Sequence, residues 1–246
     1  MSVRRRLAAV ALLVVAALAS GCASAPASDR AVLLRRVIAS SVQLRTERDG
    51  GGRRAASGVV VASDPGRRRS WVVTTRHFLE PGVRQQVSVS GVSGTGRAKA
   101  AVAALSDEAD LALIEVEGVA LPPAALKDHA ALGEEVWVVA FPWGRRLTIV
   151  GGIVSQIAAA GDEVMLEGPV RQIDALASYG ASGGGVFDAA SGRLLGIVEG
   201  YRTARVALPT QPERTMDVPV PGETTVLASP VIRRFLVAIG LVTAAE

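Results

Sequence analysis

Cysteine is almost absent from this chain of 246 residues, which has only one, Cys22. A single cysteine excludes an internal disulfide bond. Aromatic residues make up only 4% of the chain and segments with helical periodicity are scarce, whereas short apolar runs recur between Gly, Pro, Ser and Asp. This pattern favours β structure, and the length suits one domain.

A large excess of charge of one sign is also missing. The formal net charge is +4, and it falls to about +1 without the three arginines at 4–6, which belong to the targeting segment described next. The other arginines come in short groups such as 67–69, which are typical of a solvated loop. The sequence therefore predicts no nucleic-acid partner.

No apolar run is long enough to span a membrane. The run at the amino terminus covers only residues 7–18, too short for a hydrocarbon layer of about 30 Å. Arginines precede it and small residues follow it, so 1–21 is predicted to be a cleaved signal peptide.

The end of this segment, Leu-Ala-Ser-Gly-Cys at 18–22, resembles a bacterial lipobox. The resemblance implies that Cys22 carries a diacylglycerol and becomes the first residue of the mature protein. We expect export across the inner membrane and a lipid anchor in the cell envelope. Because Ala23 follows the cysteine, the outer membrane facing the periplasm is favoured over the inner membrane. The alternative is an incidental cysteine at the end of an ordinary signal peptide.

Two sets of apolar runs organise the rest of the chain. We assign residues 22–36 to the lipidated cysteine and a tether, with a short helix at about 31–39, and expect a proline-containing linker at 121–132. Strands before the linker are predicted at 41–46, 57–62, 71–75, 86–92, 98–104 and 111–116. Strands after it are predicted at 136–140, 148–157, 164–167, 171–173, 185–188, 193–199 and 225–227.

This organisation predicts an all-β fold of two packed six-stranded antiparallel β-barrels with a short C-terminal helix. Barrel one should occupy about 40–120 and barrel two about 132–230. Apolar residues at helical spacing place the closing helix at 230–240. The segment 201–223 is predicted to be a flexible loop.

The strongest chemical signal is the Gly-Ala-Ser-Gly-Gly turn at 180–184, with Ser182 at its tip. A serine becomes a good nucleophile only beside a base. The chain has two histidines: His77 follows an apolar strand, whereas His129 lies in the linker, so His77 is the better candidate. Asp110 directly precedes another apolar strand and could orient the imidazole. The order His, Asp, Ser is that of chymotrypsin.

Four segments in order, at 72–77, 110–113, 133–155 and 172–184, resemble the trypsin-like proteases of the HtrA/Deg group, and the resemblance covers about residues 40–240. It implies a protease domain at 37–246 without a PDZ domain. It also implies a catalytic triad of His77, Asp110 and Ser182, with the backbone N–H groups of Gly180 and Ser182 forming the oxyanion hole.

One position departs from the family pattern. Ala181 stands where the HtrA group usually has asparagine and where chymotrypsin-like enzymes have an aspartate that pairs with a new amino terminus. Activation through such an ion pair is excluded, so the oxyanion loop must be held by other means.

By the same resemblance, Leu176 and Ala177 shape the primary substrate pocket, and Ile197, Val198 and Glu199 lie on the strand that pairs with the substrate backbone. No acidic residue stands at 176, so we expect a preference for small or medium aliphatic side chains over Lys or Arg.

The resemblance implies a serine endopeptidase that hydrolyses peptide bonds in unfolded or misfolded cell-envelope proteins, with no metal and no organic cofactor. Its partners would be those polypeptides and, through the lipid anchor, a membrane; a homo-oligomer is compatible with the family. Two alternatives stay open. One is a non-catalytic peptide-binding lipoprotein on a protease scaffold, and the other is a regulatory protease with one dedicated substrate.

Overall fold

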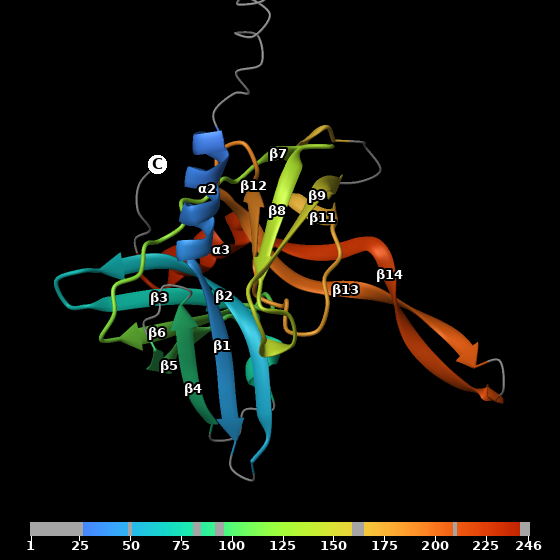
Figure 1. The fold of residues 1–246 in the computed structure, drawn as a ribbon, viewed down its shortest axis with the longest axis horizontal. Helices are drawn as coiled ribbons and strands as arrows, with labels where there is room; N and C mark the ends of the chain where they lie inside the picture. Colours follow the sequence, from blue (N-terminus) through green and yellow to red (C-terminus); the bar gives the residue numbers. More distant parts are fainter. Residues whose placement is uncertain are drawn as a thin grey trace, which may run out of the picture.

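Two closed antiparallel β-barrels pack against each other in the computed structural model of this chain, which describes residues 27–48, 51–80, 85–91, 96–158, 165–208 and 211–241 (Figure 1). Barrel one has the strand order β1-β2-β3-β6-β5-β4, and barrel two has the order β11-β14-β13-β12-β8-β9. The predicted fold of two six-stranded barrels is therefore confirmed.

Barrel one contains all six strands that the apolar runs predict. Their inward side chains, among them Leu44, Val72 and Ile114, form a buried cluster that fills the barrel. Alternation of inward and outward side chains along each strand separates this core from a polar outer face. The strands are β1 (Ser41–Arg48), β2 (Arg53–Asp64), β3 (Arg69–Thr74), β4 (Gln85–Gly91), β5 (Arg97–Leu105) and β6 (Ala112–Glu117).

Barrel two contains six of the seven predicted strands. The run predicted at 164–167 contributes only the short β10 (Glu167–Gly168), which pairs with β7 (Ala130–Ala131) outside the barrel. The barrel strands are β8 (Glu135–Ala140), β9 (Thr148–Ile157), β11 (Val170–Asp174), β12 (Gly185–Asp188), β13 (Leu194–Leu208) and β14 (Gln211–Ala228).

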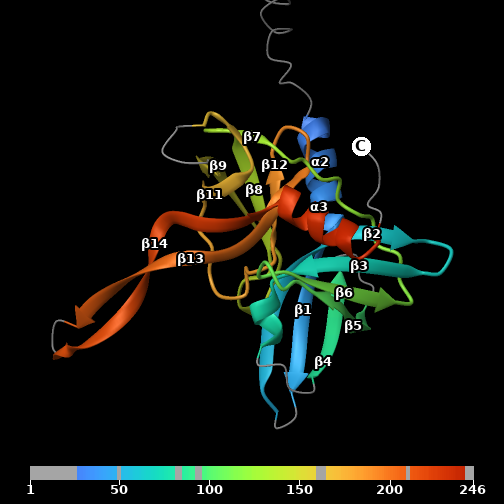
Figure 2. The ribbon, with the colours of Figure 1, turned by 180° about the vertical axis from the view of Figure 1, so that it is seen from behind.

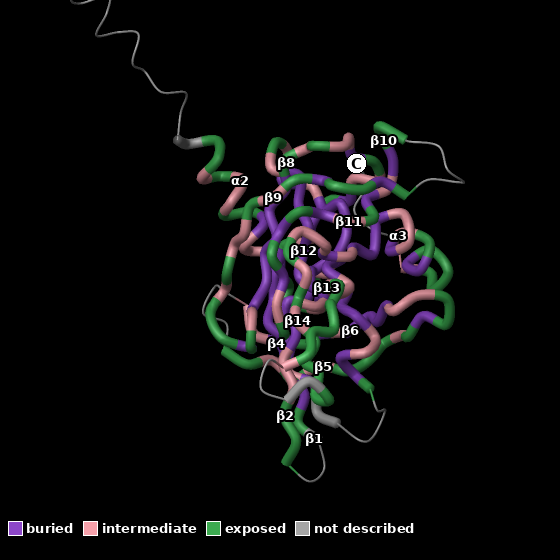
Figure 3. Tube along the Cα trace, turned by 90° about the vertical axis from the view of Figure 1, so that its right-hand side faces the viewer, coloured by how far each residue is buried: buried purple, intermediate pink, exposed green. Residues whose placement is uncertain are grey.

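A further apolar cluster lies between the barrels. Figure 3 shows the buried parts of the trace gathered toward the middle of the molecule. Val73 and Leu113 from barrel one meet Trp137, Phe187 and Ile197 from barrel two, and all five are nearly inaccessible to solvent. Helix α3 (Ser229–Ala238) covers this cluster, as seen from behind in Figure 2. It lies within two residues of the helix predicted at 230–240. Burial of this apolar interface fixes the cleft between the barrels.

The amino-terminal helix is longer than predicted. Helix α2 spans Ala27–Ala39, so residues 27–36, which we assigned to the tether, belong largely to the folded unit. Leu33 and Val37 pack against the cluster between the barrels, and Arg30 stacks over Trp137 at 5.1 Å. These contacts stabilise a helix whose own apolar pattern is weak.

In the segment predicted as a flexible loop at 201–223, residues 201–208 and 211–223 instead continue β13 and β14. The two strands form a long antiparallel ribbon that projects from barrel two (Figure 1). Opposite charges face each other across it, with Arg202 bound to Glu223 at 3.0 Å and Arg205 to Asp217 at 3.3 Å. Cross-strand pairs of this kind stabilise the ribbon. The loop prediction failed because the prolines and the glycine of this segment are typical of turns.

The linker predicted at 121–132 runs along barrel two and is tied to it by ion pairs. Lys127 contacts both Glu134 and Asp188, and Asp128 binds Arg233 of α3 at 3.0 Å.

None of the helices in the described ranges combines the length and the apolar character needed to cross a bilayer. The predicted signal peptide at 1–21 and the lipidation site Cys22 lie outside the described residues.

Candidate active site

His77 sits on a short 3₁₀ helix, η1 (Arg76–Leu79), directly after strand β3. Phe78 and Leu79 are buried and hold this turn against barrel one. From β2, the guanidinium of Arg54 donates hydrogen bonds to the carbonyl oxygens of His77 and Glu80, at 3.1 and 2.5 Å. The imidazole is thereby fixed at the edge of barrel one, with 41% of its side chain exposed toward the cleft.

Asp110 lies just before β6 and faces His77 with both carboxylate oxygens. Oδ1 accepts the backbone N–H of His77 at 2.8 Å, and Oδ2 lies 2.5 Å from Nδ1. Burial by itself would raise the pKa of Asp110, but the hydrogen bonds from the side chain and backbone of His77 outweigh it, so this pKa lies below its ordinary value. An ionised carboxylate only accepts, so Nδ1 carries a proton and Nε2 is left as a base.

Ser182 stands on a tight turn just before β12 that two glycines make possible. Gly180 and Gly183 have φ values of +87° and +79°, a region that residues with a side chain rarely adopt. A Cβ on Gly183 would also lie 2.1 Å from the carbonyl oxygen of Ser57, and one on Gly180 would lie 2.7 Å from the Trp143 nitrogen. Close packing against both barrels therefore leaves no room for a side chain at Gly180 or Gly183.

The carbonyl groups on either side of the Gly180 nitrogen are held inside the protein. The Tyr179 oxygen accepts the backbone N–H of Trp143 at 2.7 Å. The Gly180 oxygen accepts the hydroxyl of Ser57 at 2.8 Å, and that hydroxyl accepts the N–H of Phe141 at 2.8 Å. In a trans peptide the N–H points opposite to the preceding carbonyl, so these bonds turn the Gly180 N–H away from Trp143.

Two backbone donors remain free beside the serine. Within the described residues, neither the N–H of Gly180 nor that of Ser182 donates to a protein acceptor. Two free N–H groups next to a nucleophile are the arrangement needed to bind a developing oxyanion. Ala181 is buried in the core of barrel two, and the hydroxyl of Ser57 holds the loop in place of the ion pair that Ala181 excludes.

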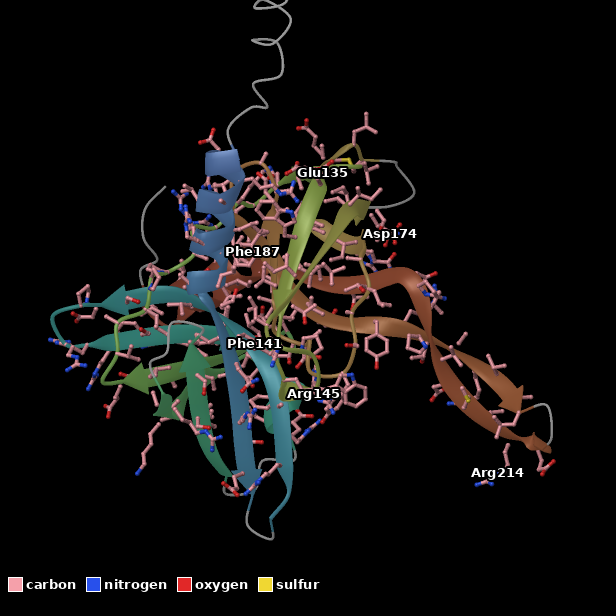
Figure 4. All side chains as sticks on the ribbon, viewed as in Figure 1. Glu135, Phe141, Arg145, Asp174, Phe187 and Arg214 are labelled. Atoms are coloured by element: carbon pink, nitrogen blue, oxygen red, sulfur yellow. The ribbon has the colours of Figure 1, made fainter. Side chains whose placement is uncertain are left out.

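A short 3₁₀ helix, η2 (Pro142–Gly144), joins this loop to barrel one. Arg45 of β1 donates to the Gly144 carbonyl at 2.8 Å, and Gln43 donates to the Arg145 carbonyl at 2.8 Å. Figure 4 shows Arg145, and Phe141 just before η2, where strands of the two barrels meet. The position of the Gly180 peptide therefore depends on contacts from both barrels.

His77, Gly180 and Ser182 line one cavity of about 340 Å³. Of the five residues expected to bind substrate, Glu199 lines this cavity; Ala177, Ile197 and Val198 are buried in the apolar cores, and Leu176 is exposed. His129 is exposed on the linker, and the residues that line the cavity do not include it. The remaining lining residues are Arg54, Ala55, Ala56, Phe78, Tyr179, Gly200, Tyr201 and Thr203.

Sequence analysis did not identify three residues that position or line the site, Ser57, Arg54 and Tyr179. Ser57 lies among small apolar residues of β2, and Arg54 lies at the start of that strand, so neither carries a local signal. Tyr179 could have been selected because it directly precedes Gly180.

The hydroxyl of Ser57 should affect catalysis more than its distance from the reacting atoms suggests. We expect Ser57→Ala to lower kcat up to about 10²-fold with little change in KM, because a misplaced oxyanion donor acts on the transition state. It should also lower the free energy of unfolding by about 1–3 kcal/mol, since it leaves the Gly180 carbonyl and the Phe141 N–H unpaired. Steady-state kinetics and urea unfolding measure the two effects.

The control is Ser63→Ala, on the same strand, where the hydroxyl donates to the Leu121 carbonyl far from the turn. It should lose comparable stability and keep its kcat. Equal kcat in both variants would show that Ser57 has only a structural role.

The sequence and the fold were compared with those of known proteins. Residues 56–197, more than half of the chain, match the trypsin-like peptidase domain family. No curated protein matches the sequence. Rv3671c from M. tuberculosis H37Rv, solved as a serine-to-alanine mutant in an inactive form, is similar with a TM-score of 0.60 and 20% identity over 85% of this chain and 90% of that chain.

A serine-to-alanine variant of the HtrA-type protease AlgW, solved with a tripeptide, is similar with a TM-score of 0.65 and 19% identity over 85% of this chain. The match spans 63% of the AlgW chain. At these identities the two structures show a shared fold. The family match over 56–197 establishes that the chain belongs to the trypsin-like peptidase domain family, and the two structures show that it has the two-barrel fold of an HtrA-type protease domain.

Proposed function

We propose that the protein is a serine endopeptidase with His77, Asp110 and Ser182 as its catalytic triad. The observation that carries the proposal is that His77, bonded to Asp110, lines one cavity with Ser182, beside two backbone N–H groups that have no acceptor among the described residues. This is the set of groups that acyl transfer to serine requires.

The groups of the site divide the steps of the proposed reaction among them. The Oγ of Ser182 attacks the scissile carbonyl while Nε2 of His77 takes its proton. The N–H groups of Gly180 and Ser182 bind the oxyanion. His77 then protonates the leaving amine. In the second half a water molecule gives a proton to His77 and attacks the acyl carbonyl, and as the bond to Oγ breaks His77 returns that proton to Ser182. Asp110 keeps Nδ1 protonated and stabilises the imidazolium that forms at each step.

The substrates we propose are unfolded or misfolded cell-envelope proteins. The resemblance to the HtrA group suggests this class, and the cavity suits it because alanines and aromatic side chains contribute to its walls beside Glu199. We keep the expectation of small or medium aliphatic side chains at the primary site, and we propose that lipidation of Cys22 holds the enzyme in the envelope, facing the periplasm.

Labelling with a fluorophosphonate probe tests the proposal directly. The purified protein should be labelled and should degrade casein, whereas Ser182→Ala should do neither. Ser155→Ala, an exposed serine on β9, is the matched control and should behave as wild type. A folded wild-type protein that is neither labelled nor active on unfolded clients would favour a peptide-binding scaffold without catalysis.

A further inference from the structure

A second and larger cavity opens beside the first. It has a volume of about 730 Å³ and lies over the outer face of barrel one, where β2, β1, β4 and β5 are neighbours. Arg54, Ala55 and Tyr179 line both cavities, so the two adjoin each other. We refer to the second cavity as the cationic groove; it is lined by Arg45, Thr46, Glu47, Arg53, Arg54, Ala55, Val87, Ser88, Arg97, Ala98, Lys99, Ala100, Trp143, Gly144 and Tyr179.

The register of the strands explains the groove. Ala55, Arg45, Ser88 and Lys99 face one another in a row across β2, β1, β4 and β5, so their side chains share the outer face. Arg97 lies in a neighbouring row, opposite Ser90. The small side chains in these rows leave room between the long cationic ones, and the floor of the groove is the sheet itself.

The charge of the groove is strongly one-sided. Five cations line it against a single carboxylate, that of Glu47, which is bound to Arg53 at 2.9 Å. Arg45 and Arg54 are engaged with backbone carbonyls, and these bonds leave their positive charge uncompensated. Arg97 and Lys99 are exposed, and no contact with a carboxylate is found for either within the described residues.

Two exposed aromatic side chains flank the passage between the cavities. The rings of Trp143 and Tyr179 are 5.2 Å apart, and 65% of Trp143 and 44% of Tyr179 are exposed. Exposed aromatic surface next to cationic side chains is suited to an extended polypeptide that carries acidic residues, because the backbone and apolar atoms pack on the rings while carboxylates reach the cations.

Strand β13 lines one of the two adjoining cavities, and the groove is the other. The first cavity includes Glu199, Gly200 and Tyr201 of β13, and the groove includes no residue of that strand. If the substrate backbone pairs with β13 before the scissile bond, the chain after that bond enters the groove. Three strand spacings give a length of roughly 14 Å, which holds about four extended residues.

We propose that the cationic groove binds an acidic segment of the substrate on the carboxyl-terminal side of the cleaved bond, with Arg97 and Lys99 as specificity-determining residues. The role in cleavage rests on the proposed endopeptidase function. Binding of the acidic polypeptide rests on the groove alone. Attraction between charges across solvent also makes the preference sensitive to salt.

Quenched fluorescent peptides test the preference. Two peptides share the residues before the cleavage site and carry either four glutamates or four glutamines after it. We expect kcat/KM to be about tenfold higher for the glutamate peptide at low salt, with the difference shrinking as NaCl is added. The double variant Arg97→Glu/Lys99→Glu should abolish or reverse the preference and retain the activity on the glutamine peptide.

Arg67→Glu is the matched control. This arginine lies in the β2–β3 turn, which projects from barrel one away from the β13–β14 ribbon (Figure 1), and its side chain is 79% exposed. It should leave the preference unchanged. An equal ratio of the two kcat/KM values in the wild type and in the double variant would overturn the proposal.

Peptide binding to the Ser182→Ala protein tests the groove independently of peptide cleavage. A labelled tetraglutamate peptide should bind in fluorescence anisotropy, about tenfold more weakly after the Arg97 and Lys99 reversals. If this holds while the wild type cleaves nothing, the groove stands and the endopeptidase proposal fails. If vesicles containing phosphatidylglycerol bind through Arg97 and Lys99 and the peptide does not, the groove is a lipid-headgroup site and our assignment is wrong.

Discussion

Alanine at Ser182 or at His77 should lower kcat for peptide hydrolysis about 10⁶-fold, and alanine at both positions should lower it little further. The nucleophile and its base act as one unit, so once either is missing the other contributes almost nothing. The part of the rate enhancement that survives would come from substrate binding and from the N–H groups of Gly180 and Ser182. Single-turnover kinetics with a chromogenic peptide measure the loss.

His129→Ala is the control for the histidine, because His129 is exposed on the linker. It should retain the wild-type rate. Multiplicative losses in the Ser182 and His77 double variant would mean that the two side chains do not act together. More than about one hundredth of the wild-type activity in the Ser182 variant would place the nucleophile elsewhere, and the same result in the His77 variant would place the base elsewhere.

Asp110→Asn should lower kcat about 10⁴-fold while leaving the fold intact. The reason lies in the two bonds to His77. Oδ1 of the asparagine can still accept the backbone N–H of His77, which turns its NH₂ group toward Nδ1. A donor at that position stabilises the tautomer in which Nε2 carries the proton, and that nitrogen can no longer accept a proton from Ser182.

The pH dependence of stability provides the accompanying test. The pKa of Asp110 is lowered in the folded protein, so its contribution to stability is fully present above the unfolded value of about 3.9 and is lost as the pH falls through the lowered pKa. Urea midpoints of the wild type and the asparagine variant should therefore differ at pH 7 and converge as the pH falls below the lowered pKa of Asp110. If Asp110→Asn retained a kcat near that of the wild type, Asp110 would not be part of the catalytic triad.

The segments of the fold that sequence analysis predicted well are those with local signals. Apolar runs bounded by turn residues located every barrel strand, because alternating burial and chain reversal are properties of consecutive residues. The prediction of a flexible loop at 201–223 was wrong because the prolines and glycine of this segment are typical of a loop, whereas strand pairing depends on cross-strand partners such as Arg205 and Asp217. Helix α2 began earlier than predicted because contacts with the barrels extend it.

Sequence by itself determined the family, the two-barrel fold and the candidates for chemistry. His77, Asp110 and Ser182 were each marked by an adjacent strand or glycine turn, and the structure places His77 against Asp110 and in one cavity with Ser182. Their triad role is a proposal that the variants above test.

Only the tertiary structure decided how the turn at Gly180 is held and where the positively charged side chains lie together. Ser57 lies 123 residues before Gly180, and its hydroxyl reaches that turn only because β2 packs against barrel two. Arg45, Arg97 and Lys99 are scattered along a chain whose net charge is small, and closure of barrel one brings them to one groove. Such contacts depend on barrel closure and packing between barrels, which no local sequence pattern specifies.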